Sequence, residues 1–421
     1  MARSKRATIE VQSRLRMFLS LDVVGSTEFK QAKRGADSAE AADSWVEPFL
    51  SFYQIAVQQM SAQWTAVRDA IAAIDPGKGN SGKGDSGRGD PGKGDGRFEF
   101  GDSPTFWKGV GDEVLFTKVV RSPLDAMAAV HALLALMNEQ RRQFAAKPQW
   151  QRLNVKGTAW LAGFPINNAE VILPVRAGRP AAGLPDDPVA ENYRLLALRE
   201  RSPATSSAYH ADYIGPSVDL GFRLRELADP RRLVISADLA WLLCHAHRGC
   251  GERERSACIY LNMPNVGYEG RTSLRGILGG DPYPLMWIES DPTNPLNNAE
   301  DKLLHRALGK GRAKQHMASL WGFCNAFLTG DSPLRMRPYI PGCRVAGLGE
   351  MSADHRLRLA AIQELVTGRT EQFNSLARSD RESGPIPTAA QNFARGILSG
   401  IEPKRSNRRR GKKRTRRTAG D

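Results

Sequence analysis

The chain has 421 residues, which is enough for one large domain or two of ordinary size. Its 41% hydrophobic and 25% charged residues are typical of a soluble globular protein, and no apolar run reaches the roughly 20 residues of a membrane span. The N-terminal segment has no apolar stretch behind its basic residues, and the five cysteines, an odd number, favour reduced thiols. We therefore expect a cytoplasmic protein without a membrane span.

The net charge of +15 is concentrated at the C-terminal end. Residues 404–421 hold ten Lys or Arg and one Asp, so the rest of the chain carries only +6. Such a composition cannot bury a core, and we predict a disordered basic tail over 401–421. The tail is either a plain solvated segment or a weak, salt-sensitive contact for nucleic acid.

After a polar lead-in over residues 1–15, the segment Arg16–Lys30 contains the first chemical signal. The apolar run Met17–Leu21 predicts a buried strand that ends in a carboxylate, Asp22, and a loop with Gly25, Ser26 and Thr27. A fixed carboxylate beside backbone N–H groups and a helix N-terminus suits a divalent metal that holds a polyphosphate. Such a site needs a second carboxylate.

A long helix is predicted over Ala41–Ile74, where apolar residues recur every three or four positions. Residues 76–96 contain Gly, Lys, Asp, Ser and no large apolar residue, which is typical of a flexible linker. Within it, Gly77–Lys83 matches a phosphate-binding loop only superficially. Gly84 stands where Ser or Thr is needed, and no strand precedes the segment.

The next predicted unit is a hairpin over Phe98–Val120 with its turn at Gly111–Asp112. Its tip supplies the second carboxylate, Asp112. A helix over Ser122–Phe144 follows, with Ser122 as its N-cap and Pro123 in its first turn.

The remaining core elements alternate between strand and helix. We predict a strand at Gln151–Leu161, an irregular insertion over 163–211 with one short strand at Glu170–Leu173, a helix at Ser217–Ala228, a strand at Arg232–Ser236, a helix at Ala237–His245 and a strand at Pro284–Glu289. The order strand–helix–strand–strand–helix–strand predicts an α+β, ferredoxin-like sheet with helices on one face. Helices within 291–400, at 299–308, 313–328 and 353–366, predict a helical C-terminal region for dimer support, sensing or effector contact.

One competing site is a cluster of possible zinc ligands: Cys244, His245, His247, Cys250 and Cys258. Their spacings match no common zinc pattern. Cys244 also fits the apolar face of its predicted helix, so we disfavour zinc.

Three segments resemble the signature blocks of class III nucleotidyl cyclases, in that family's order: FLSLDVVGST at 18–27, WKGVGDEVLF at 107–116 and YIGPSVDLGFRLRELADPRRLVIS at 213–236. The resemblance covers roughly residues 15–245 and implies a class III cyclase catalytic domain over 16–290. Together with LRGILGGDPYPLMWI near residue 280, these blocks look most like bacterial pyrimidine cyclases of anti-phage signalling.

The resemblance also implies roles for individual residues. Asp22, Asp112 and the backbone carbonyl of Val23 would hold two divalent cations, Mn²⁺ or Mg²⁺. Arg223, four residues after Asp219 and thus on the same helix face, would stabilise charge on the transferring phosphorus. The family usually has an asparagine where this chain has Asp219. The remaining candidates bind substrate: Lys108 and Asp212 at the base, and Gly25, Ser26, Thr27 and Arg275 at the phosphates.

The implied function is conversion of UTP, before CTP, to a 3′,5′-cyclic monophosphate that a separate effector reads in antiviral defence. The resemblance further implies a homodimer with composite active sites. Lys108 with Asp212 resembles the pair of adenylate cyclases, so an adenylate or guanylate cyclase is the first alternative. An inactive cyclase-like protein that binds nucleic acid through its tail is the second.

Overall fold

The computed structural model describes residues 10–32, 45–73, 100–174, 187–201, 209–248, 266–308, 314–330, 335, 337–345 and 347–382. The chain forms two compact units, Met1–Val366 and Thr367–Asp421. All the described strands belong to the first unit, and the second begins within helix α11 (Ala353–Glu382). The predicted linker at 76–96 and the predicted tail at 401–421 lie outside the described residues.

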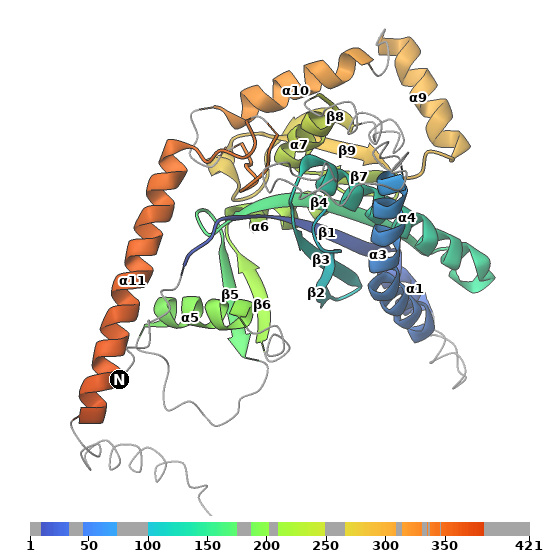
Figure 1. The fold of residues 1–421 in the computed structure, drawn as a ribbon. Helices are drawn as coiled ribbons and strands as arrows, with labels where there is room; N and C mark the ends of the chain where they lie inside the picture. Colours follow the sequence, from blue (N-terminus) through green and yellow to red (C-terminus); the bar gives the residue numbers. More distant parts are fainter. Residues whose placement is uncertain are drawn as a thin grey trace, which may run out of the picture. The chain divides into compact units, whose positions relative to one another are not determined.

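A seven-stranded sheet forms the centre of the first unit (Figure 1). Its order is β2 (Thr105–Val110), β3 (Glu113–Val119), β1 (Arg14–Val24), β4 (Asn154–Phe164), β7 (Arg232–Ile235), β9 (Tyr283–Glu289) and β8 (Val266–Thr272). All neighbouring strands of this sheet pair antiparallel except β4 and β7, which pair in parallel. The order β4-β1-β3-β2 is the ferredoxin-like arrangement, so the predicted α+β fold is confirmed.

The main core lies on the face of the sheet that α3 (Val46–Ala73), α4 (Pro123–Ala146) and α7 (Ala237–Arg248) cover. Every second residue of β1 contributes to it: Leu15, Met17, Leu19, Leu21 and Val23. Because successive side chains of a strand point to opposite faces, the residues between them lie on the other face. As predicted, Ser122 caps α4 by accepting a hydrogen bond from the backbone N–H of Asp125 at 3.1 Å.

The opposite face carries a smaller aromatic cluster and helix α6 (Pro216–Arg225), so the expectation of helices on one face only is corrected. Phe18 stacks on Trp160 with ring centroids 5.3 Å apart. Gly221 of α6 lies against the same indole, where a β-carbon would come within 2.1 Å of a ring atom. The absence of a side chain at residue 221 therefore lets α6 approach the sheet.

The segment 163–211, which we expected to be irregular apart from one short strand at Glu170–Leu173, contains that strand as β5 (Ala169–Pro174) and also holds α5 (Pro188–Arg201). β5 pairs with β6 (Tyr209–Ile214) in a separate two-stranded sheet that stands apart from the main sheet in Figure 1. Asn192 of α5 accepts a hydrogen bond from Ile172 and donates one to the Glu170 carbonyl, both at 2.9 Å. Such long-range contacts leave no local pattern in the sequence.

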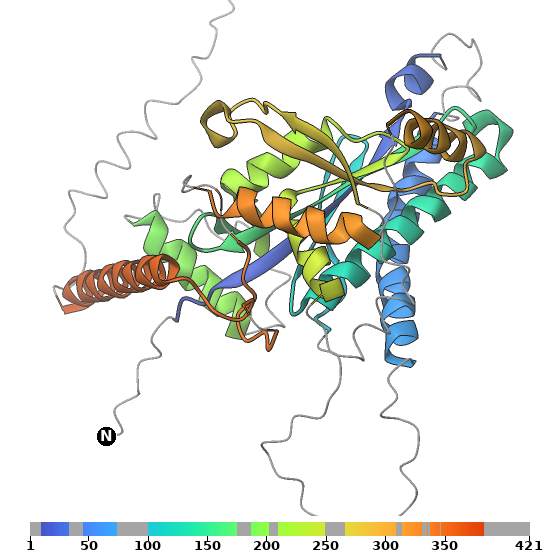
Figure 2. The ribbon, with the colours of Figure 1, turned by 90° about the horizontal axis from the view of Figure 1, so that it is seen from above.

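The C-terminal helices α9 (Pro295–Leu308) and α10 (Lys314–Leu328) belong to the same unit as the sheet. Figure 2 shows α10 alongside the β8–β9 hairpin, and the contacts agree. The rings of Phe323 and Tyr268 are 4.9 Å apart, and Cys324 lies 3.8 Å from the Met286 sulfur. Among the described helices, none is both long and apolar enough to cross a membrane.

Replacing Gly221 with alanine should destabilise the first unit, because the added methyl group meets the Trp160 ring. We expect a loss of roughly 1–3 kcal/mol in the free energy of unfolding, as for other overpacked cores. Gly322→Ala in α10 is the matched control, because a β-carbon there meets nothing within 4 Å. Urea denaturation of both variants measures the difference. Equal stability of the two variants would contradict the close packing of α6.

Candidate active site

Asp22 and Asp112 lie next to each other at one edge of the sheet. Asp22 is near the end of β1, and Asp112 occupies the turn between β2 and β3. The backbone N–H of Val23 donates to the Asp112 carbonyl at 3.2 Å and ties the turn to the strand. Burial raises the pKa of Asp22 and the charge of Asp112 raises it further, while Lys156 opposes both effects. The two carboxylates are thus close enough to repel each other.

Two glycines shape the backbone around these carboxylates. Gly25, between β1 and α1 (Ser26–Ala32), has φ +83°, and a β-carbon there would lie 2.9 Å from the Arg152 carbonyl oxygen. Gly111, just before Asp112, has φ +67°. Residues other than glycine rarely adopt such angles, so both predicted turns depend on glycine. Of the predicted loop residues, Ser26 is buried and Thr27 is exposed.

Glu113, which we did not predict as a site residue, anchors the hairpin from within. It is buried, and its carboxylate accepts hydrogen bonds from the Ser20 hydroxyl and the Arg225 guanidinium. Burial raises the pKa of Glu113, although these two partners favour its charged form. Arg225 ends α6, so this ion pair joins α6 to the strand that follows Asp112. Only its position beside Gly111–Asp112 could have suggested such a role.

Two lysines accompany the carboxylates, and the sequence reading missed both. Lys156 faces Asp22 across the β1–β4 pairing, with its Nζ 3.5 Å from Oδ2. Lys30 of α1 has its Nζ 3.9 Å from Asp112 Oδ2. Neither lysine stands next to its aspartate in the sequence. The β1–β4 pairing brings Lys156 to Asp22, and the position of α1 brings Lys30 to Asp112.

The residues expected to read the base do meet. Lys108 of β2 donates to Asp212 Oδ1 of β6 at 2.8 Å, and the Trp107 indole donates to the same oxygen at 3.1 Å. Burial raises the pKa of Asp212, but hydrogen bonds from Lys108 and the Tyr213 backbone outweigh it, so the pKa is lowered. The carboxylate is therefore charged and held in place. Its contact with Lys108 joins segments 104 residues apart in the chain.

The remaining predicted residues, Arg223, Arg275 and Asp219, have surroundings of their own. Arg223 is partly exposed and forms an ion pair with Glu226 at 3.3 Å. Arg275 is exposed in the turn after β8. Among the described residues, no ion pair or hydrogen bond joins Arg223, Asp219 or Arg275 to Asp22 or Asp112 within one chain.

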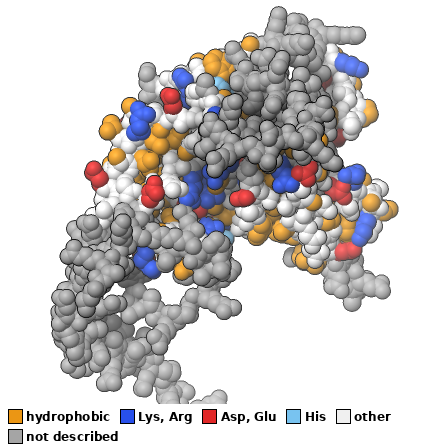
Figure 3. All heavy atoms as spheres, in the orientation of Figure 1, with side chains coloured by type: hydrophobic (Ala, Val, Ile, Leu, Met, Phe, Trp, Pro, Cys, Tyr) orange, Lys and Arg blue, Asp and Glu red, His pale blue; other side chains and the backbone are white. Residues whose placement is uncertain are grey.

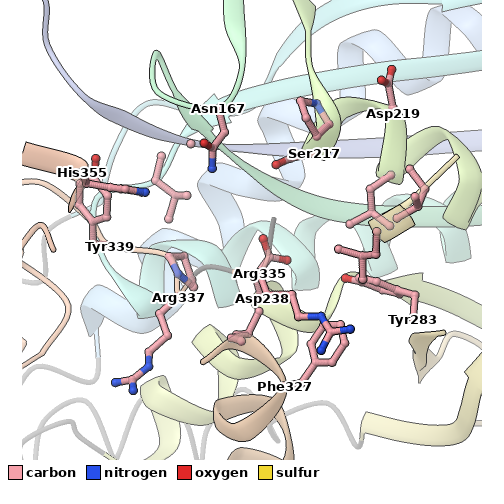
Figure 4. A pocket seen from close by; sticks show the side chains of 18 of the residues that line it. Asn167, Ser217, Asp219, Asp238, Tyr283, Phe327, Arg335, Arg337, Tyr339 and His355 are labelled. Atoms are coloured by element: carbon pink, nitrogen blue, oxygen red, sulfur yellow. The ribbon is translucent and has the colours of Figure 1, made fainter. Parts of the chain in front are cut away.

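Asp219 lines a cavity of about 250 Å³ between α6, the β8–β9 turn and residues 335 and 337–339. Figure 4 shows Asp238, Arg335 and Tyr283 gathered at this cavity, with Asp219 at its edge. The Arg335 guanidinium lies over the Phe327 ring at 4.8 Å and pairs with Asp281 at 2.6 Å. The C-terminal region thus forms a wall beside one of the predicted site residues.

The donor set at Asp22 and Asp112 fits hard divalent cations, which prefer carboxylate and carbonyl oxygens. The two mutually repelling carboxylates are the observation that supports this fit. Within the described residues, no group of three or more His, Cys, Asp or Glu could hold a metal ion. Of the disfavoured zinc ligands, Cys244 is buried in the core, whereas Cys250 and Cys258 lie outside the described residues.

The pH dependence of folding should report on Asp238 in the cavity wall. Burial raises the pKa of Asp238 to about 6, although Ser236 and the Leu239 backbone N–H hydrogen-bond its carboxylate. Between about pH 4 and 6, the folded protein therefore holds a proton that the unfolded chain releases. The contribution of Asp238 to the free energy of unfolding is full below about pH 4 and is lost as pH rises through about 6.

Relative to the Asp238→Asn variant, the wild type should lose roughly 2–3 kcal/mol of unfolding free energy between about pH 4 and 7.5. Urea unfolding at several pH values measures this difference. Parallel stability curves for the two proteins would contradict the assignment to Asp238.

No protein-family model and no curated protein sequence matches the chain. Solved structures with a similar fold include the adenylyl cyclase CyaB from P. aeruginosa, at 14% identity over 66% of this chain and 95% of that chain, with a TM-score of 0.33. The guanylyl cyclase Cya2 has 13% identity over 68% and 98%, with a TM-score of 0.32. A bacterial light-regulated adenylyl cyclase has 11% identity over 72% and 59%, with a TM-score of 0.35.

Proposed function

We propose that this chain is a cytoplasmic nucleotidyl cyclase that converts UTP, in preference to CTP, to the 3′,5′-cyclic monophosphate and pyrophosphate. The observation that carries the proposal is the adjacency of Asp22 and Asp112, which come from segments 90 residues apart and are tied together by the Val23–Asp112 hydrogen bond. In the reaction, the ribose 3′-oxygen forms a bond to the α-phosphorus and loses its proton. The bond from that phosphorus to the β-phosphate oxygen breaks, and pyrophosphate leaves.

Asp22, Asp112 and the Val23 carbonyl would hold two divalent cations, Mn²⁺ or Mg²⁺. Such cations would supply Lewis acidity toward the 3′-hydroxyl and positive charge beside the triphosphate. The protein contributes rigid placement. β1 holds Asp22 between two neighbouring strands, and the buried Glu113–Arg225 ion pair holds the hairpin that carries Asp112. Gly25, Ser26 and Thr27 are proposed to contact the phosphates.

Lys108 and Asp212 are the proposed base-reading pair, with one donor and one acceptor side by side. A uracil offers its O4 to the lysine and its N3–H to the carboxylate. Cytosine, adenine and guanine can also offer one acceptor beside one donor, so this pair alone does not select the base. The preference for UTP rests on the resemblance of the sequence blocks, and the Lys108–Asp212 contact keeps a purine cyclase as the second candidate.

A homodimer completes the proposed site. Arg223 is partly exposed and makes no ion pair or hydrogen bond with the described carboxylates Asp22 and Asp112 of its own chain. In a head-to-tail dimer, Arg223 and Asp219 of one protomer would face the metal carboxylates of its partner, each protomer serving the other. Asp219, in place of the family's asparagine, would hold a ribose hydroxyl, and Arg275 would reach the phosphates. The cyclic product would act on a separate effector in antiviral defence.

A nucleic-acid-binding protein with an inactive cyclase-like domain is the alternative from another class, and it would act through residues 404–421. On the face in Figure 3, Lys and Arg side chains are interspersed with Asp and Glu. In this alternative the tail would supply the phosphate contacts.

Incubating the full chain with each of the four NTPs and Mn²⁺, then resolving products by mass spectrometry, tests the proposal. We expect cyclic UMP as the main product and a loss of at least about 100-fold in Asp22→Asn and Asp112→Asn. Asp69→Asn is the matched control, because it removes an exposed carboxylate on α3. Cyclic AMP or GMP as main product would favour the purine alternative. The absence of any cyclic product, together with tight, salt-sensitive binding of RNA or DNA, would favour the nucleic-acid-binding alternative.

Mixing inactive Asp22→Ala and Arg223→Ala proteins tests the composite site. Random exchange places both substitutions in the same site of each heterodimer and leaves its other site intact. We expect about a quarter of wild-type activity, because half of the dimers carry one working site of two. Each variant alone, at the same total concentration, is the control. No recovery after verified subunit exchange would overturn the head-to-tail arrangement.

A further inference from the structure

Lys156 is fixed opposite Asp22 by the sheet itself. The two residues are direct partners in the antiparallel β1–β4 register, and directly opposed side chains share one face of a sheet. The Lys156 Nζ lies 3.5 Å from Asp22 Oδ2, and about a fifth of each side chain is exposed. Lys30 repeats the arrangement at the second carboxylate, 3.9 Å from Asp112. Each proposed metal-binding aspartate thus has a lysine of its own.

These two ion pairs differ in kind from the third pair at this edge. Arg225 hydrogen-bonds the buried Glu113, whose second oxygen is taken by Ser20. Both lysine pairs are longer than the roughly 2.7–2.9 Å of a charge-assisted hydrogen bond, and all four side chains reach solvent. The Arg225–Glu113 pair is therefore a structural contact, whereas the lysine pairs are loose enough to exchange.

We propose that Lys156, assisted by Lys30, is a resident counterion that a divalent cation must displace from the carboxylates. This inference rests on the proposed function, because it assigns Asp22 and Asp112 to metal binding. It adds that these lysines compete with the metal for the two aspartates and thereby lower the affinity of the site for a divalent cation.

The competition follows from charge and from the lysine side chain. An ammonium 3.5 Å from Asp22 lowers the negative potential that attracts a cation, and a bound cation in turn repels the ammonium. The flexible four-carbon stem lets the ammonium move away without any change in the backbone of β4. Lys30 is the weaker competitor, because its distance is longer and its Nζ also lies over the Phe49 ring at 4.4 Å.

Mn²⁺ binding to the full chain, measured without nucleotide by electron paramagnetic resonance of free Mn²⁺, tests the proposal. Lys156→Met removes the charge and keeps the length of the side chain. We expect it to bind Mn²⁺ about tenfold more tightly than wild type, and Lys30→Met about threefold more tightly. Lys156→Arg keeps the charge and should bind within about twofold of wild type.

Lys147→Met is the matched control, because it removes a lysine that pairs with a glutamate, Glu47, at 2.6 Å outside the site. Its Mn²⁺ affinity should equal that of wild type. If Lys156→Met binds Mn²⁺ no more tightly than wild type does, the proposal is overturned, provided that circular dichroism shows that the variant is folded. If Lys156→Met does not fold, Lys156→Gln and Lys30→Met decide by the same criterion.

Asp22→Asn separates this inference from the proposed function. If Asp22→Asn binds Mn²⁺ as wild type does, then the metal site fails and the inference fails with it. If Asp22→Asn loses binding but Lys156→Met gains none, only the counterion role is wrong. A second readout is thermal unfolding with and without Mn²⁺: the Mn²⁺-induced rise in Tm should be larger in Lys156→Met than in wild type.

Discussion

The antiparallel pairing of β1 with both β3 and β4 is the constraint on which the candidate site depends. It places Asp22 directly opposite Glu113 on one side and Lys156 on the other. Because side chains alternate along a strand, the same pairing sends Leu19, Leu21 and Val23 into the main core. A register shift of one residue would bury the carboxylate and expose the core. Stability and site geometry are therefore set by the same hydrogen bonds.

The opposite face of the sheet links the proposed base-reading pair to α6. Phe18 packs on Trp160 and Trp107, and Trp107 in turn holds Asp212 through its indole N–H. Gly221 lets α6 approach the same aromatic cluster, and Arg225 at the end of α6 reaches the buried Glu113. Residues of helix α6, the β2–β3 hairpin and the β5–β6 sheet thus meet on the same face of the main sheet. Lys108 and Asp212 reach the surface there, and the aromatic cluster beneath them is buried.

The order of the core elements could be predicted, because their apolar periodicities and caps are local. The hairpin turn at Gly111–Asp112 and the Ser122 cap agree with the sequence reading. β8 and α5 were not predicted. β8 has a largely exposed, Gly- and Arg-containing sequence, and α5 lies within a stretch rich in Pro, Ala and Arg. Such elements are stabilised by pairing with β9 and by Asn192 contacts with β5, which no local pattern reveals.

The sequence by itself predicted the two aspartates and the glycines of their turns, because each stands in a short segment with its own signature. The resemblance of the sequence blocks added Lys108 and Asp212 as a predicted pair. Only the tertiary structure decided which charges surround them. Lys156, Lys30 and Arg225 come from three different elements, and each meets its carboxylate only after the sheet and α6 have assembled. Coulombic contacts depend on distance in space, not along the chain. The carboxylates could therefore be predicted from the sequence, whereas the charged side chains that surround them could be identified only in the folded structure.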